Sequence, residues 1–196
     1  MPFEHLQKYL PRFSKIWRLG PHLGALRAVP NFIGVFAEIV FFLLNLLILA
    51  IFPAGVEKIK NKITTSIWLA VAIGVAFEIL FIPAIILFAI SIIGIPLIPA
   101  FFLAVLVAIM FGVTSLSSVV GKKIVEGFKW NVTSKVGTFS LGWIALMIIP
   151  ILGMILSAVD FPLITIILGV PISFVIMTIA LGATTLALFK KEIEGK

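Results

Sequence analysis

Two long stretches of the sequence are almost free of charge, and they constrain the fold more than any other feature. Residues 67–120 contain one charged residue, Glu78, and residues 139–189 contain one, Asp160. A helix needs about 20 apolar residues to cross a membrane, so each stretch is long enough for two crossings. Residues 32–56, in which Glu38 is the one charged residue, add a further crossing. The predicted spans are 32–56, 67–93, 96–120, 139–159 and 163–189.

The composition excludes a water-soluble globular protein. Hydrophobic residues make up 62% of the chain and charged residues 12%, whereas soluble domains have about 25% charged residues. Eight carboxylates, two histidines and no cysteine also leave few groups for catalysis. We therefore expect an all-α membrane bundle over residues 31–196, with no enzymatic activity, no metal site and no cofactor. The net charge of +7 is interpreted as membrane topology rather than nucleic-acid binding.

Residues 1–30 form a basic, amphipathic arm. Apolar side chains recur every three or four residues from Phe3 to Trp17, and basic side chains alternate with them, as on the two faces of one helix. The arm is either an interfacial helix on an anionic leaflet or a docking arm against a partner or against the bundle itself. Its candidate lipid- or partner-binding residues are Lys8, Arg12, Lys15, Trp17, Arg18 and Arg27.

The two long apolar stretches contain matching turns. Ile93-Gly94-Ile95-Pro96 follows Trp68, and Leu168-Gly169-Val170-Pro171 follows Trp143 at the same spacing. Glycine permits unusual backbone angles and proline starts a new helix, so both motifs predict helical hairpins. The shared spacing favours an internal repeat of units 67–120 and 139–189, although hairpins can converge on the same turn residues. The predicted turn residues are Gly94, Pro96, Gly169 and Pro171.

The basic residues predict the orientation in the membrane. If all five segments cross, ten lysines lie on one side and the five basic residues of the arm lie on the other. The ten-lysine side, with the C-terminus, is then cytoplasmic by the positive-inside rule. If the first span is a hairpin instead, all fifteen basic residues lie inside. The apolar turn residues leave open whether the hairpin tips reach water or stay within the bilayer.

Three carboxylates lie inside apolar stretches and are candidate intramembrane polar sites: Glu38, Glu78 and Asp160. They serve either as structural polar contacts, which we favour, or as proton or cation sites of a carrier. The hydroxyl residues between 114 and 118 are expected to bond backbone groups or to pack small faces between helices. The four tryptophans lie near segment edges, which is typical of interfacial anchors.

Three segments carry a resemblance to a known family. They are Leu49-Ala50-Ile51-Phe52-Pro53, the run from Ile82-Pro83 to Ile92-Ile93-Gly94-Ile95-Pro96-Leu97, and Ile149-Pro150-Ile151-Leu152-Gly153 with the later Leu181-Gly182-Ala183. In this order they resemble the multi-span membrane domain associated with bactofilin-type polymer-forming cytoskeletal proteins of bacteria, over about residues 40–190. The chain departs from that pattern in its basic arm and in having no β-helical bactofilin domain. The resemblance implies a scaffold or anchor in the bacterial inner membrane rather than an enzyme.

The sequence thus leads to two functional hypotheses. The first is a non-enzymatic scaffold, anchor or accessory subunit that forms a homo-oligomer or joins a larger membrane complex. Its basic segments would bind anionic membrane lipid or an acidic partner. The second is a small oligomeric carrier or channel that uses Glu78. Substitution of Glu78 by glutamine distinguishes them, because a carrier would lose flux and a scaffold would keep its assembly.

Overall fold

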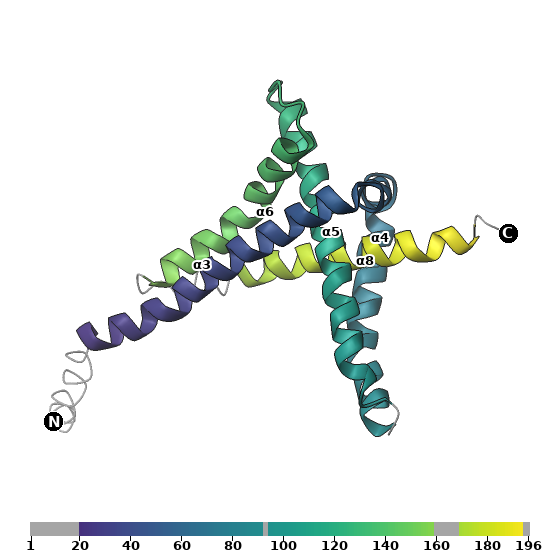
Figure 1. Cartoon of the computed structure of the whole chain (residues 1–196), viewed down its shortest axis with the longest axis horizontal. Helices are drawn as coiled ribbons and strands as arrows, with labels where there is room; N and C mark the ends of the chain where they lie inside the picture. Colours follow the sequence, from purple (N-terminus) through teal and green to yellow (C-terminus); the bar gives the residue numbers. More distant parts are fainter. Residues whose placement is uncertain (1–19, 92–93, 159–168, 194–196) are drawn as a thin grey trace, which may run out of the picture.

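The computed structural model describes residues 20–91, 94–158 and 169–193, and these ranges are helical almost throughout, without strands (Figure 1). The all-α class is therefore confirmed. The helices are α3 (Gly20–Ile51), α4 (Pro53–Ile90), α5 (Leu97–Gly127), α6 (Lys135–Ala158) and α8 (Val170–Ile193).

Four of these helices are long and apolar enough to cross a membrane. The apolar segments are Ile33–Ile51, Pro53–Ile90, Leu97–Gly127 and Val170–Phe189. The corresponding segment of α6, Lys135–Ile148, is shorter. The chain is thus a membrane protein by the length and composition of its helices, with four candidate spans in the described residues rather than the five predicted.

The first junction differs from the sequence-based prediction. The first span was expected to continue to residue 56, but α3 ends at Ile51 and Pro53 begins α4. The chain turns at Phe52, which has φ −121° and ψ 51°. Proline is favoured in the first turn of a helix because the amide hydrogens there have no helical acceptor. Pro53 therefore starts a new helix inside the segment that was predicted as a single span.

A second break divides α4 into two parts. Ser66 has φ −147° and ψ 48°, which is not helical. The part before it, residues 53–65, is amphipathic: Val56, Ile59 and Ile63 are buried, whereas Glu57 and the other charged side chains there are more exposed. The break falls at the start of the predicted second span, so a short amphipathic helix precedes that span.

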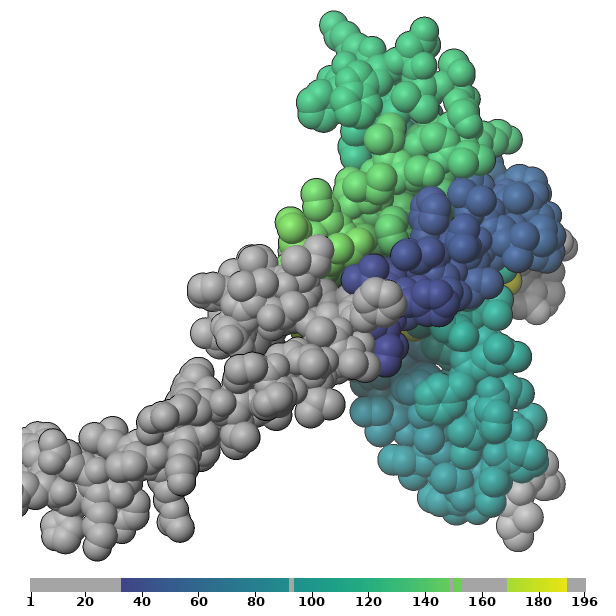
Figure 2. All heavy atoms as spheres, turned by 60° about the vertical axis from the view of Figure 1, so that its left-hand side comes forward, coloured from purple at the N-terminus to yellow at the C-terminus, as the bar shows by residue number. Residues whose placement is uncertain are grey.

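The helices form two arms that diverge from a common centre. The rest of α4 runs antiparallel to α5 in a hairpin that projects from the body, in teal in Figures 1 and 2. In the other arm α3 lies beside α6. Helix α8 crosses both α4 and α5, and the contacts between α4 and α8 are the most extensive in the molecule. The centre of the fold is therefore the region where α8 meets the hairpin.

Glycines permit the close crossing of α4 and α8. A Cβ atom on Gly74 would overlap the carbonyl of Thr178, and one on Gly182 would overlap the carbonyl of Ala70. At this crossing α4 presents Ala70 and Gly74, and α8 presents Thr178 and Gly182, each pair four residues apart. Since lipid removes the hydrophobic drive for helix association, close van der Waals packing of small residues must hold such a crossing.

The same arrangement recurs between α5 and α6. A Cβ atom on Gly121 would overlap the carbonyl of Thr138, and one on Gly142 would overlap the carbonyl of Ser117. On α5, Ser117 and Gly121 are four residues apart. They face Thr138 and Gly142 of α6, which are also four residues apart. Helix α5 uses a further glycine, Gly112, against α8. Two equivalent small-residue crossings therefore hold the helices together.

The first predicted turn forms the tip of the α4–α5 hairpin. The amide of Gly94 donates to the carbonyl of Ser91 at 2.9 Å, and the amide of Leu97 donates to the carbonyl of Gly94 at the same distance. Pro96 stands immediately before α5, as predicted for a residue that starts a helix. The expected unusual glycine conformation was wrong, because no glycine of the described residues has positive φ. Gly94 is required instead because a Cβ atom would overlap the carbonyl of Phe88.

The second predicted turn is described in part. Gly169 is buried, and Pro171 is the second residue of α8. The first turn of a helix suits proline. Residue 168 and the residues that lead to it lie outside the described residues.

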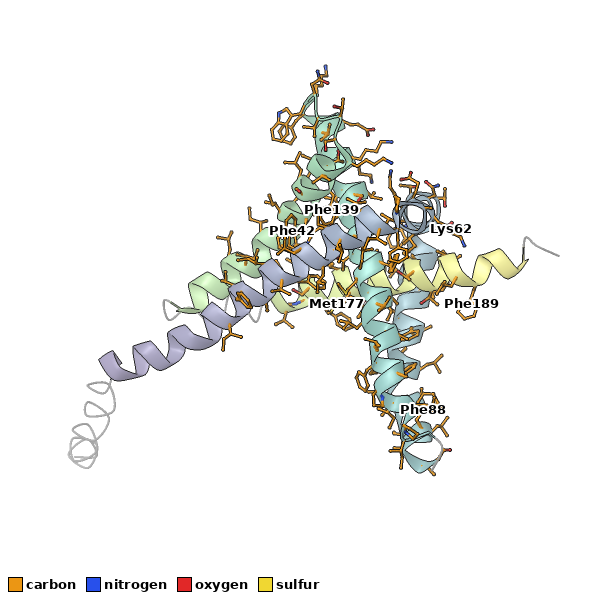
Figure 3. All side chains as sticks on the ribbon, viewed as in Figure 1. Phe42, Lys62, Phe88, Phe139, Met177 and Phe189 are labelled. Carbon is orange, nitrogen blue, oxygen red and sulfur yellow. The ribbon has the colours of Figure 1, made fainter. Side chains whose placement is uncertain are left out.

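Aromatic side chains fill the space between α3 and α6. Phe42 stacks on Phe139 with ring centroids 5.7 Å apart, and both residues are labelled between α3 and α6 in Figure 3. Trp143 packs edge-on against Phe42 at 4.9 Å and is 7% exposed. The expectation that Trp143 is an interfacial anchor was therefore wrong. Trp68, which is 84% exposed, remains compatible with that role.

Candidate lysine-rich site

Apart from Glu38 and Glu78, the charged side chains that the structure describes gather at one end of the molecule. This lysine-rich end comprises residues 53–66 and 122–135, which together contain seven lysines and two glutamates. In Figure 3 nitrogen and oxygen atoms cluster near Lys62 and along the loop at the top, whereas the sticks around Phe88 are almost all carbon. The two segments lie 56 or more positions apart in the sequence, and the fold brings them together.

A cleft lies between the two segments. It has a volume of about 340 Å³ and is lined by α3, α4, α5, α6 and the loop that joins α5 to α6. Lys60, Lys122 and Lys135 contribute the basic groups of the cleft, and Glu57 and Glu126 contribute the acidic ones. We call this feature the lysine cleft. Val56 and Leu49 provide part of its apolar wall.

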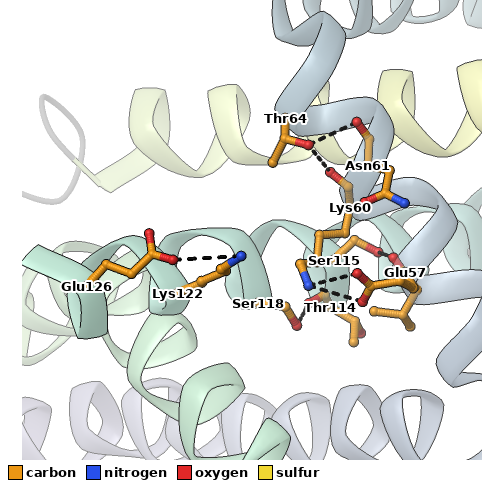
Figure 4. A network of polar contacts seen from close by, with 10 residues as sticks. Glu57, Lys60, Asn61, Thr64, Thr114, Ser115, Ser118, Lys122 and Glu126 are labelled. Atoms are coloured by element: carbon orange, nitrogen blue, oxygen red, sulfur yellow. Dashed lines mark hydrogen bonds and ion pairs between the residues drawn. The ribbon is translucent and has the colours of Figure 1, made fainter. Parts of the chain in front are cut away.

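Four of the five charged side chains that line the lysine cleft form ion pairs. Lys60 donates to both carboxylate oxygens of Glu57 at 3.0 Å, and Lys122 Nζ lies 3.7 Å from Glu126 Oε1 (Figure 4). Both pairs join neighbours on one helix, and exposed pairs of this kind are worth only about 0.3–0.5 kcal/mol. They are therefore easily exchanged for a stronger anion. Lys135 has no ion pair within the described part of the chain.

Buried hydroxyl groups fix the helices beneath the cleft. Ser115 donates to the carbonyl of Val56 at 3.1 Å, which attaches the start of α4 to α5. Thr114 donates to Oδ1 of the fully buried Asn45 at 2.8 Å, which attaches α3 to α5. The cleft is thus built on a rigid base in which three helices are joined by hydrogen bonds.

The hydroxyl residues at 114–118 behave largely as predicted. Thr114 and Ser115 also donate to the carbonyls of Met110 and Phe111, and Ser118 donates to that of Thr114. Each bond links a residue to the carbonyl four positions earlier. Ser117 instead lies in the crossing with Gly142, where its buried hydroxyl has no hydrogen-bond partner among the described residues.

The two intramembrane carboxylates that the structure describes, Glu38 and Glu78, have different surroundings. Glu78 accepts a hydrogen bond from Thr178 at 2.7 Å, so it links α4 to α8. Glu38 lies on α3 and lines two cavities next to α6 and α8. Asp160 lies outside the described residues. The expectation of a structural polar contact therefore has a matching geometry at Glu78.

The basic residues proposed for the N-terminal arm are not part of the described site. Lys8, Arg12, Lys15, Trp17 and Arg18 lie outside the described residues, as does the helix expected there. Arg27 falls within the backbone of α3, which begins at Gly20 and continues through Pro30. Among the described residues, no group of three or more histidine, aspartate or glutamate side chains could hold a metal ion.

The residues that shape the site could not be recognised as a group from the sequence. Lys60, Lys122 and Lys135 were considered for topology and, among the basic segments, for lipid or partner binding, but not as one site, because no local pattern shows that their segments meet. Gly121 and Gly142, which bring α5 and α6 together beside the cleft, were not singled out either. A signal for them was present: pairs of small residues four apart in apolar helices are typical of close helix contacts in membranes.

Comparisons with known proteins give no match: no family model, no curated protein and no solved structure is significantly similar to the chain. The resemblance to bactofilin-associated membrane domains consequently stays a prediction. Within residues 20–91, 94–158 and 169–193, the fold defines the class of an all-helical protein with four helices that could span a membrane.

Proposed function

We propose that the chain is a non-enzymatic integral membrane scaffold, anchor or accessory subunit, and that its lysine cleft binds the phosphate headgroup of an anionic lipid. The observation that carries this proposal is the convergence of Lys60, Lys122 and Lys135 on one cleft at the border of the apolar helices. Lysines at a membrane surface attract anionic lipid. A cleft that combines these groups with an apolar wall suits a molecule with a charged head and a hydrocarbon tail.

The hydrogen bonds inside the bundle favour a scaffold function over a transport function. The buried threonines are used in contacts between helices: Thr114 binds Asn45, and Thr184 donates to the carbonyl of Ala108 at 2.9 Å. The carboxylate of Glu78 is likewise bound, by Thr178. A carrier that uses Glu78 would have to break this hydrogen bond between α4 and α8 in each transport cycle. Among the described residues, we find no second hydrogen-bond donor that would replace Thr178.

The orientation follows from the same lysines. We place the lysine-rich end on the cytoplasmic side, because basic residues next to spans are retained there. The bacterial inner membrane and an anchoring role for a polymer-forming cytoskeletal protein remain proposals that derive from the sequence resemblance. Assembly with further copies or a larger complex would use the apolar outer faces of the helices, many of whose large side chains are exposed.

The internal repeat is also a proposal. Both units contain a Gly-x-Pro motif at the start of a helix, α5 in the first unit and α8 in the second. The two tryptophans of the pattern differ sharply, since Trp68 is 84% exposed and Trp143 is 7% exposed. If the units arose by duplication, both Gly-x-Pro motifs have kept their place at the start of a helix, whereas the two tryptophans differ in burial.

Native mass spectrometry with defined lipid tests the headgroup site. We would measure retention of phosphatidylglycerol by the full chain and by the variant Lys60→Gln/Lys122→Gln/Lys135→Gln. The matched control is Lys58→Gln/Lys123→Gln/Lys129→Gln, which removes three exposed lysines from the same end outside the cleft. Each lysine near the headgroup contributes up to about 1 kcal/mol, so we expect the cleft variant to bind at least about tenfold more weakly than the control.

Equal weakening in the two variants would overturn the cleft as a specific site, because it would mean that only the summed surface charge matters. Retention of zwitterionic phosphatidylcholine as strongly as phosphatidylglycerol would overturn it as well. The same spectra test the scaffold proposal. A stable assembly or one stoichiometric partner is expected after gentle extraction, and a lone monomer in all mild detergents would contradict a scaffold role.

A further inference from the structure

The lysine cleft contains carboxylates as well as lysines, and attraction of a phosphate does not explain them. Its charged lining residues are Lys60, Lys122, Lys135, Glu57 and Glu126. Three positive and two negative charges leave a net charge of +1 in the cleft. A site that only attracted anions would be stronger without the two glutamates, because they offset most of its positive charge. The glutamates therefore require an explanation of their own.

Both carboxylates keep free positions for hydrogen bonds. Lys60 donates to both oxygens of Glu57 at 3.0 Å. Lys122 Nζ lies 3.7 Å from Glu126 Oε1, which is longer than a hydrogen bond. An ionised carboxylate has about four acceptor positions. The side chains of Glu57 and Glu126 are 58% and 63% exposed, so a molecule that enters the cleft can reach their unused acceptors.

The two glutamates come from different helices. Glu57 belongs to α4 and Glu126 to α5. In Figure 4 the ion pair of Lys60 with Glu57 lies to one side of Ser118, and the ion pair of Lys122 with Glu126 lies to the other. Ser118 also lines the cleft. A headgroup between the two pairs would therefore meet a lysine and a carboxylate on each side.

This combination of groups selects the chemistry of the headgroup. The phosphate of a phosphodiester carries one negative charge and accepts hydrogen bonds from lysine, whereas an ionised carboxylate only accepts and needs a donor. A hydroxyl group supplies that donor without a further charge. The second negative charge of a phosphomonoester would lie beside the glutamates, and an ammonium group would lie beside the lysines. A phosphodiester with a hydroxyl group suits both kinds of side chain.

We propose that Glu57 and Glu126 accept hydrogen bonds from hydroxyl groups of the lipid headgroup, so that the lysine cleft selects a phosphodiester lipid with a hydroxylated headgroup. This inference rests on the headgroup site of the proposed function. The lysines bind the phosphate, and the glutamates distinguish among lipids of the same charge. Phosphatidylglycerol, whose terminal glycerol carries hydroxyl groups, has this chemistry.

Two lipids of equal charge test the proposal. Phosphatidylglycerol and phosphatidylmethanol with identical acyl chains are both anionic phosphodiesters, but phosphatidylmethanol has no headgroup hydroxyl. Native mass spectrometry of the full chain measures the retention of each lipid. We expect the chain to retain phosphatidylglycerol about fivefold more strongly, a value that discounts a hydrogen bond to a charged group for its exposure to solvent.

Variants of the glutamates locate the preference. Glu57→Ala/Glu126→Ala removes both carboxylates from exposed helical positions, which alanine tolerates well. We expect this variant to retain the two lipids equally. Because it also makes the cleft more positive, a second variant adds Lys58→Gln and Lys123→Gln, which restores the net charge at exposed positions outside the cleft. It should lose the preference as well.

The outcomes separate this inference from the proposed headgroup site. Equal retention of the two lipids by the original chain would overturn the role of the glutamates, and so would a preference that persists in Glu57→Ala/Glu126→Ala. In either case the headgroup site stands if Lys60→Gln/Lys122→Gln/Lys135→Gln weakens the retention of both lipids more than its control does. If that lysine variant behaves like its control, the headgroup site and the role of the glutamates both fail.

Discussion

The two ends of the α4–α5 hairpin differ more than any other two regions of the described protein. At the lysine-rich end, ion pairs form on α4 and on α5, and side chains from four helices line a cleft. At the tip, Gly94 and Leu97 bond only to the backbone and the hydroxyl of Ser91. A backbone turn that satisfies itself can stay within a membrane, whereas a cluster of lysines requires water or anionic headgroups. From this contrast we infer that the lysine-rich end of the hairpin lies in water or among headgroups, and we call it the wet end. The tip around Gly94 lies within the membrane, and we call it the dry end.

The largest loss of stability should follow a substitution at Gly142, in the crossing of α5 and α6 beside the wet end. In Gly142→Leu the new side chain collides with the carbonyl of Ser117, so α5 and α6 must move apart. We expect a loss of at least about 3 kcal/mol in unfolding free energy, the upper range for overpacking, together with loss of phosphatidylglycerol retention. Denaturant titration in lipid–detergent micelles measures the first quantity and native mass spectrometry the second.

Gly127→Leu is the control for this prediction, because no atom lies within 4 Å of a Cβ atom at Gly127. Its unfolding free energy should remain close to that of the original chain. Similar destabilisation in the two variants would mean that the crossing does not determine stability.

A substitution at the dry end should destabilise the tip of the hairpin without affecting the lysine cleft. Gly94→Leu places a Cβ atom against the carbonyl of Phe88, which must open the turn. We expect destabilisation of about 1–3 kcal/mol from this overpacking, without a change in lipid retention at the other end of the hairpin. Loss of phosphatidylglycerol retention in a folded Gly94→Leu variant would show that the two ends are not independent.

A smaller effect is expected from the base of the cleft. Asn45→Leu removes the bond from Thr114 across α3 and α5, but Thr114 keeps its bond to the carbonyl of Met110. Hydrogen bonds between membrane helices average about 0.6 kcal/mol. Destabilisation of about that size is expected in the same titration. A loss as large as that of Gly142→Leu would mean that polar contacts, rather than small-residue packing, dominate the fold.

The smallest effect should follow Glu78→Gln. Glutamine keeps an oxygen that can accept the hydrogen bond of Thr178. The change in unfolding free energy should stay below about 0.5 kcal/mol, the typical range away from critical contacts, and assembly should be unchanged. Loss of ion or proton flux in reconstituted vesicles would favour the carrier hypothesis instead.

The local features could be predicted from the sequence, and those that depend on distant contacts could not. Hydropathy predicts the helices, the proline motif predicts where α5 begins, and the backbone bonds of Thr114 and Ser115 follow from their place in an apolar helix. The break at Ser66 was missed because hydropathy carries no information on dihedral angles.

The candidate site was missed for a different reason. The lysine cleft requires residues 53–66 and 122–135 to meet, and they meet because α4 and α5 form a hairpin whose crossings depend on small residues. Trp143 was assigned to the interface because it follows a polar loop in the sequence. Its burial is due to Phe42 on α3, a contact between residues 101 positions apart.

The central claim is that the two lysine-bearing segments meet at one face of the membrane. Because the chain has no cysteine, Lys62→Cys and Lys129→Cys can be labelled separately with a membrane-impermeant thiol reagent in sealed vesicles of known orientation. We expect both to react from the same, cytoplasmic side, and Ile95→Cys at the hairpin tip not to react from that side. Reaction of Lys62→Cys and Lys129→Cys from opposite sides would contradict the central claim.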